Sequence, residues 1–269
     1  MTQVGVTNLK DVQNLADERG IEIQKVGVSD VHLPFFIKTK NGSLQSVLAK
    51  IKLTVDLPKE YKGTHMSRFI EILSEWTQKP VAFREMEHIL GDTLKRLTAR
   101  SAHLHIDFKY FIEKTAPVSG LKSMLDLDCS FSANLIQGQP LEFLMGVNVP
   151  FTSLCPCSKE ISRYGAHNQR GLMKVKRRKN SGFIWIEDLA ALMEAQGSCP
   201  VFPLLKREDE KYVTELAYEN PKFVEDILRD LVLALRKLEH ITWFEIECEN
   251  YESIHNHSAY ASHTEFVKR

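Results

Sequence analysis

The sequence predicts an α+β protein built from two tandem units, each with the element order strand-strand-helix-helix-strand-strand. Two observations lead to this fold class. Long segments alternate apolar with polar residues, which is typical of strands with one buried face, and other segments repeat apolar residues at helical spacing. The same order of elements then occurs twice, although the two halves share almost no sequence identity. Because strands joined by short turns pair antiparallel, we expect antiparallel sheets with the helices on one face.

The first unit is expected to span residues 31–135, behind a polar N-terminal arm at residues 1–30. Its first two strands flank the dipeptide Asn41-Gly42, which favours a hairpin turn. Two apolar stripes at helical spacing follow, and then two alternating segments around a turn at residues 117–120. The expected elements are strands 33–40 and 47–55, helices 67–76 and 83–100, and strands 104–112 and 125–131.

The second unit is expected to span residues 136–269. Asn220-Pro221 is expected to cap a long helix whose apolar stripe runs from Val224 to Leu238. The dense charge run at residues 206–211 is typical of a solvated loop, although it could also supply phosphate-binding cations and a carboxylate ligand. The other expected elements are strands 141–151 and 171–179, helix 185–196, and strands 242–248 and 258–268.

The predicted sheets leave one face without helices. That face would need a cover, so the sequence predicts a homo-oligomer, with a closed barrel of sheets as one arrangement.

The composition excludes several classes of protein. The 269 residues include 35 basic and 35 acidic side chains, and this balance argues against bulk attraction to nucleic acid or to an anionic membrane. Residues 1–21 lack the apolar core of a signal peptide, and no apolar run is long enough to span a bilayer. Five cysteines, an odd number, without an export signal indicate free thiols in the cytoplasm.

Two thiols and a histidine stand close together in the sequence. Cys155 and Cys157 flank Pro156, and His167 follows in a loop-like run. Thiolate and imidazole are the usual ligands of zinc and similar metals, but structural zinc sites prefer wider cysteine spacing and a second pair. Two ordinary buried thiols remain an alternative. One metal-binding thiol beside a second, non-ligating thiol fits the pattern better.

Other candidates are two pairs of histidines and a helical glutamate. His255 and His257 are two residues apart and can line one site, whereas His103 and His105 are expected to decorate a polar sheet face. Glu225 falls near the edge of an apolar helical stripe, where a carboxylate needs a partner. The N–H donors of a guanine edge would suit it, although most such glutamates merely flank the core.

Several blocks of the chain resemble the type IB class of GTP cyclohydrolase I, in the expected order. They are residues 63–69, the cysteine block 153–162, the histidine block 165–170, residues 205–211 and residues 252–257. The resemblance implies the tunnelling fold, with two such units in each chain and a homotetramer around a central tunnel. It also implies the conversion of GTP and water to 7,8-dihydroneopterin triphosphate and formate, a step toward folate and queuosine. One divalent metal per site is implied, with zinc, manganese or iron as candidates.

The resemblance also implies roles for individual residues. The implied metal ligands are Cys155, His167 and Glu210, with His255 near or at the metal. The implied catalytic residues are His255 and His257, which would move protons while water attacks C8 of guanine, and Cys157, at the site wall or in proton handling. Substrate would be held by Glu225, at the guanine edge, and by Arg68, Lys206 and Arg207, at the triphosphate, with Lys159 and Arg170 in reserve. Because these segments come from both halves of the chain, sites at or near subunit interfaces are expected.

Three alternatives remain open at this point. An archaeal-type iron(II) cyclohydrolase would give a cyclic phosphate product from the same substrate. A non-catalytic nucleotide-binding scaffold would bind GTP without releasing formate. A thiol hydrolase with a cysteine nucleophile and a histidine base would be insensitive to chelators.

Overall fold

The computed structural model describes residues 13, 15–179 and 184–267. The predicted strands and helices occur in the predicted order, with two short strands and two helices in addition. The first half contains β1 (Ile23–Lys38), β2 (Leu44–Leu57), α1 (Met66–Ser74), β3 (Pro80–Val81), α2 (Phe83–Leu97), β4 (Ser101–Thr115) and β5 (Lys122–Ile136). The second half contains β6 (Glu142–Leu154), α3 (Pro156–Ile161), β7 (Asn168–Lys179), α4 (Ile186–Glu194), β8 (Cys199–Pro200), α5 (Arg207–Glu219), α6 (Val224–Arg236), β9 (Ile241–Asn250) and β10 (Ala259–Phe266).

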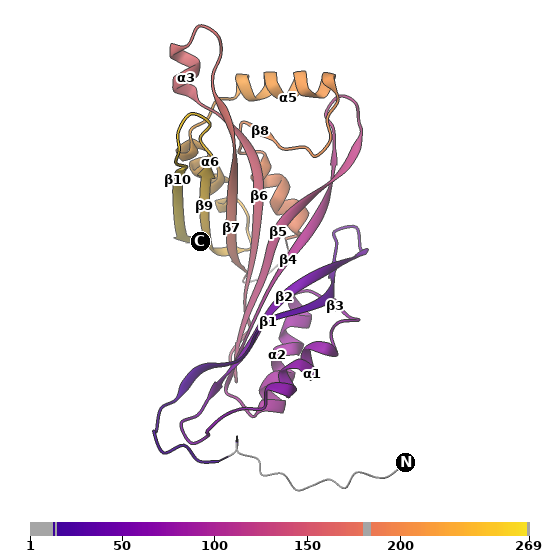
Figure 1. The fold of residues 1–269 in the computed structure, drawn as a ribbon, viewed down its shortest axis with the longest axis vertical. Helices are drawn as coiled ribbons and strands as arrows, with labels where there is room; N and C mark the ends of the chain where they lie inside the picture. The colour runs from indigo at the N-terminus through magenta and orange to yellow at the C-terminus, as the bar shows by residue number, and fades with distance from the viewer. Residues whose placement is uncertain (1–12, 14, 180–183, 268–269) are drawn as a thin grey trace.

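The strands form one continuous sheet in the described part of the chain. Its neighbours run β10-β9-β7-β6-β5-β4-β2-β1-β3, with β8 paired to β6 off this path. The two halves therefore contribute matching four-strand sets, and they join where residues 128–134 of β5 pair antiparallel with residues 142–148 of β6. The predicted boundary at residues 135 and 136 falls at the end of β5. Figure 1 shows the long strands running through the molecule, with α1 and α2 beside one end and α3 to α6 at the other.

Helices cover one face of the sheet, as predicted. α2 packs against β4 and β5, α4 against β6, and α6 against β9 and β10. The alternating positions of the strands that face these helices are buried and form one hydrophobic core with the helices. Hydrophobic burial of this kind is the main stabilising contribution to the fold.

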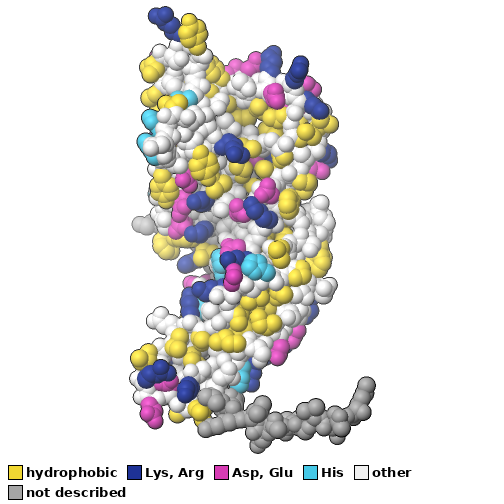
Figure 2. All heavy atoms as spheres, viewed as in Figure 1, with side chains coloured by type: hydrophobic (Ala, Val, Ile, Leu, Met, Phe, Trp, Pro, Cys, Tyr) yellow, Lys and Arg dark blue, Asp and Glu magenta, His cyan; other side chains and the backbone are white. Residues whose placement is uncertain are grey.

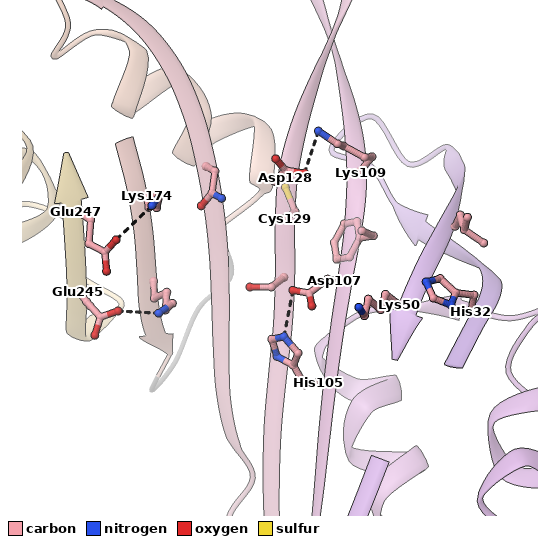
Figure 3. A pocket seen from close by; sticks show the side chains of 15 residues that line it. His32, Lys50, His105, Asp107, Lys109, Asp128, Cys129, Lys174, Glu245 and Glu247 are labelled. Atoms are coloured by element: carbon pink, nitrogen blue, oxygen red, sulfur yellow. Dashed lines mark hydrogen bonds and ion pairs between the residues drawn. The ribbon is translucent and has the colours of Figure 1, made fainter. Parts of the chain in front are cut away.

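The opposite face is charged and internally paired. A hollow of about 720 Å³ on this face is lined by side chains from β1, β2, β4, β5, β6, β7 and β9 (Figure 3). Lys109 Nζ lies 2.9 Å from carboxylate oxygens of both Asp126 and Asp128, and Lys176 Nζ lies 2.8 Å from Glu245 Oε1. Figure 2 shows basic, acidic and histidine side chains gathered at the middle of the molecule. Such a face can remain in contact with water. That it is covered by another copy of the chain stays a prediction.

The sheet edges give a second reason to expect assembly. β10 ends the sheet on one side, and on the other side β3 pairs with only Phe36 and Ile37 of β1. Unpaired strand edges offer backbone groups for pairing with another chain. No helix in the described ranges is long and apolar enough to cross a membrane.

The sheet extends into the predicted N-terminal arm. β1 begins at Ile23, so residues 23–30 belong to the sheet, while residues 1–12 and 14 lie outside the described part. The register of β1 against β2 shifts between Val28 and Val31, and Asp30 takes a positive φ of 60° there. These irregularities break the alternation of apolar residues, so the first part of β1 does not show the two-residue period of a regular strand.

Two predictions around the second-half helices were wrong. The charge run at residues 206–211 enters α5 instead of a solvated loop, and Asn220 ends that helix instead of capping the next. α6 begins at Val224, where Asp226 Oδ2 accepts a hydrogen bond of 3.1 Å from Phe223 N. The charge run did not suggest a helix because the face of α5 that carries it is largely exposed, and tertiary contacts stabilise this helix.

Candidate functional site

Cys155 and His167 meet where β6 and β7 end their pairing. Leu154 and Asn168 are the last pair of this antiparallel ladder, so Cys155 and His167 are the next residues on each strand. Cys155 N donates to His167 O at 3.1 Å, and His167 N donates to Ser158 Oγ at 3.2 Å. The structure thus brings the backbones of the two residues that the sequence singled out next to each other.

Local sequence explains the turn between these two residues. Pro156 occupies the first turn of α3, where its missing N–H costs nothing, and Cys155 Sγ accepts from Ser158 N at 3.5 Å. Gly165 has a φ of 123°, which strongly favours glycine, and this lets the chain return from α3 into β7. Cys157 lies exposed on α3, so the two thiols have different surroundings.

His167 is surrounded by polar groups that the sequence analysis did not select. Its Nδ1 lies 2.9 Å from Gln169 Oε1 and 4.0 Å from Glu252 Oε2. Glu252 lies two residues beyond the end of β9, the strand that pairs with β7, and its side chain is only 13% exposed. Glu252 lies in the block 252–257, but its position in the sequence gave no reason to single it out from the nearby acidic residues of β9. Only the strand order shows that the end of β9 lies beside His167.

Glu225 lies in the first turn of α6, and the start of that helix is tied to the cysteine strand. Lys222 N donates to Leu154 O at 3.0 Å, and Ser153 Oγ donates to Lys222 O at 3.1 Å. Both contacts lie within a few residues of Glu225 and Cys155. Glu225 itself is exposed.

His255 and His257 belong to the irregular segment 251–258 between β9 and β10. Their rings stack with centroids 5.1 Å apart and planes 14° apart, and both residues are exposed. Tyr251 N donates to Arg170 O at 2.9 Å, which fixes the base of this segment beside β7. The two histidines therefore project together, as their spacing predicted.

The remaining candidates lie elsewhere in the protomer. Lys206, Arg207 and Glu210 are at the start of α5, while the other end of α5 meets α3, where the Lys159 ammonium contacts the Tyr218 carbonyl and lies 4.3 Å from its ring centroid. Figure 1 shows that α1, which carries Arg68, lies at the opposite end of the molecule from α3. Arg68 Nη1 donates to Arg96 O at 3.1 Å.

One protomer does not assemble the predicted set of metal ligands. Across the part of the chain that the structure describes, no group of three or more His, Cys, Asp and Glu side chains is arranged to hold a metal ion. Cys155 and His167 come together, whereas Glu210 is held at the far end of α5.

Asp209 holds the start of α5 against the hairpin between β4 and β5. Its Oδ1 accepts from Val118 N at 2.8 Å and Ser119 N at 2.9 Å, and its Oδ2 accepts from Ser119 Oγ at 2.6 Å and Lys206 N at 2.9 Å. Burial opposes ionisation of this carboxyl, but the hydrogen bonds from Ser119, Lys206 and Val118 outweigh it and hold the pKa of Asp209 well below its usual range. The neighbouring Glu210 is positioned by this clamp.

Asp209→Ala is expected to lower the Tm by several degrees, because three backbone N–H groups and one hydroxyl lose their acceptor. The Tm of Asp209→Asn should lie between those of Asp209→Ala and the wild type, since an amide keeps only one acceptor oxygen. Thermal unfolding followed by circular dichroism at pH 7 measures both Tm values. Glu208→Ala, which removes an exposed neighbouring carboxylate, is the control. Equal Tm values for Asp209→Ala and the wild type would contradict a clamp.

The same clamp has a defined pH dependence. The folded-state pKa of Asp209 is depressed, so its stabilising effect is complete above the ordinary carboxyl value of 3.8 and is lost as the pH falls below it. The Tm difference between wild type and Asp209→Ala should therefore be constant near neutral pH and shrink in strong acid.

Comparisons with known proteins agree on one family. Residues 9–261 match the family model described as type I GTP cyclohydrolase folE2. The chain is 55% identical over 254 residues to the GTP cyclohydrolase FolE2 of Geotalea uraniireducens (strain Rf4), covering 94% of this chain and 92% of that protein. It is also 55% identical over 254 residues to the GTP cyclohydrolase FolE2 of Geobacter sulfurreducens, covering 94% and 97% respectively.

Solved structures share the fold at low identity. A highly active mutant of the Bacillus sp. TB-90 urate oxidase superposes with a TM-score of 0.54 at 11% identity, covering 91% of this chain and all of that one. The same enzyme without chloride gives a TM-score of 0.52 at 10% identity, with the same coverage. At such identities the likeness shows the fold alone, and that fold is the predicted tunnelling fold.

Proposed function

The chain belongs to the type I GTP cyclohydrolase folE2 family, and from this premise we propose that it hydrolyses GTP to formate and 7,8-dihydroneopterin triphosphate. The reaction opens the five-membered ring of guanine and releases C8. The observation that carries the proposal is the junction of Cys155 and His167, whose backbones are hydrogen-bonded where β6 and β7 end their pairing.

A divalent metal suits the donor chemistry at this junction. A thiolate and an imidazole suit zinc and other borderline-soft divalent ions, and a carboxylate would also accommodate manganese or iron. Cys155 and His167 would hold the metal, with Glu210 as the proposed third ligand and His255 near it. When bound, such a metal acts as a Lewis acid that makes water nucleophilic near neutral pH.

The residues around this junction have proposed roles with the substrate. Glu225 accepts hydrogen bonds from the ring N–H and the exocyclic amine of guanine. His255 and His257 are proposed to exchange protons with N7 and N9 as the ring opens, since imidazole titrates near neutral pH. Cys157 is proposed to line the site or to handle protons.

We propose that the complete site needs a second copy of the chain. Arg68 and the start of α5 lie far from α3 within one protomer, yet the triphosphate carries about four negative charges and needs several cations. The unpaired edges of β1 and β10 provide a way for copies to associate, and a homotetramer with sites at its interfaces is the proposed assembly. Glu210, Arg68, Lys206 and Arg207 would then reach the cysteine junction of another copy.

Incubation with GTP under defined metals tests this function. Protein stripped with a chelator is expected to release no formate, and Mn(II), Zn(II) or Fe(II) added back separately should restore formate and the fluorescence of the oxidised pterin. Product mass separates the triphosphate from a cyclic phosphate. Full turnover by protein shown to be metal-free would contradict the metal-dependent mechanism.

A further inference from the structure

A buried chain of hydrogen bonds leads from a backbone carbonyl to the His167 ring. It begins at Lys222 O, which accepts from Ser153 Oγ at 3.1 Å. Ser153 Oγ is in turn 3.3 Å from Gln169 Nε2 and 3.0 Å from Asn250 Nδ2. Gln169 Oε1 then lies 2.9 Å from His167 Nδ1. Ser153, Asn250 and Gln169 are 1%, 2% and 7% exposed, so water cannot substitute freely for these partners.

The Lys222 carbonyl, at one end of this hydrogen-bond network, determines which group donates and which accepts in each of its hydrogen bonds. A carbonyl oxygen only accepts, so the single Ser153 hydroxyl proton is committed to Lys222 O. Ser153 Oγ can then only accept from its other two partners, which must present N–H groups to it. For Asn250 this leaves Oδ1 buried without a hydrogen-bond partner. Turning that amide over would place two acceptor oxygens face to face, so the orphaned oxygen is consistent with a constrained network.

The same argument sets the Gln169 amide, and a second contact supports it independently. Gln169 Nε2 also lies 3.4 Å from Glu252 Oε1, and an ionised carboxylate only accepts. Turning the amide over would set Gln169 Oε1 against Glu252 and against a Ser153 oxygen that has no proton to give. Gln169 therefore presents Oε1, an acceptor, to the imidazole.

To form a hydrogen bond with that acceptor, the His167 ring must carry a proton on Nδ1. A second acceptor, Glu252 Oε2, lies 4.0 Å from the same nitrogen. We propose that Gln169 is a positioning residue that holds the His167 ring with a proton on Nδ1, which leaves Nε2 as the nitrogen that faces the metal. This rests on the proposed function, in which His167 is a metal ligand.

Positioning of the His167 ring by Gln169 is expected to raise the metal affinity of the site. A ligating histidine whose second nitrogen is fixed by a partner is oriented before the metal arrives, and loss of such a partner costs about 10- to 100-fold in metal affinity. Because the network is anchored at Lys222 O, the segment before α6 also takes part in orienting this ring.

Two substitutions at Gln169 separate this role from simple packing. Gln169→Met keeps the length of the side chain but offers His167 no acceptor, so Zn(II) affinity of the chelator-stripped protein should fall about 10- to 100-fold. Gln169→Glu keeps an acceptor for Nδ1–H but loses the donor to Ser153, so it should retain affinity within about threefold while its Tm falls. Competition with a chromophoric chelator measures the affinity, and His167→Ala provides the baseline. ¹⁵N NMR of metal-free, histidine-labelled protein, assigned with His167→Asn, should show Nδ1 protonated and Nε2 unprotonated.

The outcomes distinguish this inference from the function on which it rests. Loss of Zn(II) affinity in His167→Ala, with Gln169→Met at the wild-type value, would overturn the positioning role and leave the ligand role intact. Equal losses in Gln169→Met and Gln169→Glu would show a packing role only. Wild-type affinity in His167→Ala would instead remove His167 from the ligands. If Gln169→Met does not fold, Ser153→Ala releases the Gln169 amide, and unchanged Zn(II) affinity and an unchanged Nδ1 signal in that variant would overturn the proposal.

Discussion

Cys155→Ala is expected to abolish bound metal and formate release together. The Cys155 thiol is the softest donor at the junction, and Cys157 is exposed on α3 in different surroundings. A catalytic metal contributes several kcal/mol to lowering the barrier, so its loss should reduce kcat at least about a hundredfold. Metal analysis and formate release measured on the same preparation check both parts.

Two features of this variant make the result interpretable. Cys155 is only half-buried and lies between the end of β6 and the start of α3, so its replacement should change the Tm little. Glu160→Gln, which removes a negative charge from the same helix α3, is the matched control and should keep metal and activity. A Cys155→Ala protein with wild-type metal content and turnover would take this residue out of the ligand set.

Glu225→Gln is expected to weaken GTP binding about 10- to 100-fold while leaving the metal content unchanged. In the proposed role of Glu225, the substitution would remove a charged acceptor for two N–H donors of guanine, and the amide would present a donor to one of them. The start of α6 stays anchored through Lys222, so the rest of the site keeps its geometry. The effect should appear in the GTP dissociation constant of the metal-loaded protein, measured by calorimetry.

The adjacent acid supplies the control for this second experiment. Asp226 accepts from Phe223 N and pairs with Arg229 at 3.0 Å, so Asp226→Asn should lower the Tm without changing GTP affinity. The same loss of GTP affinity in both variants would indicate a general charge effect, and wild-type affinity in Glu225→Gln would contradict the anchor.

The local patterns of the sequence predicted most elements correctly. The hairpin at Asn41-Gly42, the stripe of α2 and the alternation of β4 and β5 all follow from periods that a short window of sequence contains. The errors occur where the alternation of apolar residues is interrupted, as at Asp30 in β1. They also occur where a helix consists largely of charged residues and lacks a clear apolar stripe, as in α5. The cap assigned to Asn220 failed because one residue can end a helix as well as begin one.

The residues of the site divide in the same way. The thiol and the imidazole could be found because their chemistry is unusual and they lie close together in the sequence. The sequence gave no role to four other polar residues of the site, because ordinary polar residues acquire a role only from the partners that strand pairing brings to them. These residues are Ser153, Gln169, Asn250 and Glu252.

The sequence by itself determined the order of the long strands and of most helices, and which side chains carry soft-metal chemistry, because these depend on local periodicity and on residue type. Only the tertiary structure decided that the ends of β6, β7 and β9 converge, that Lys222 O sets the donors around His167, and that Arg68 and Glu210 lie away from Cys155 in one protomer. Those outcomes depend on contacts between residues far apart in the chain, which no local pattern encodes.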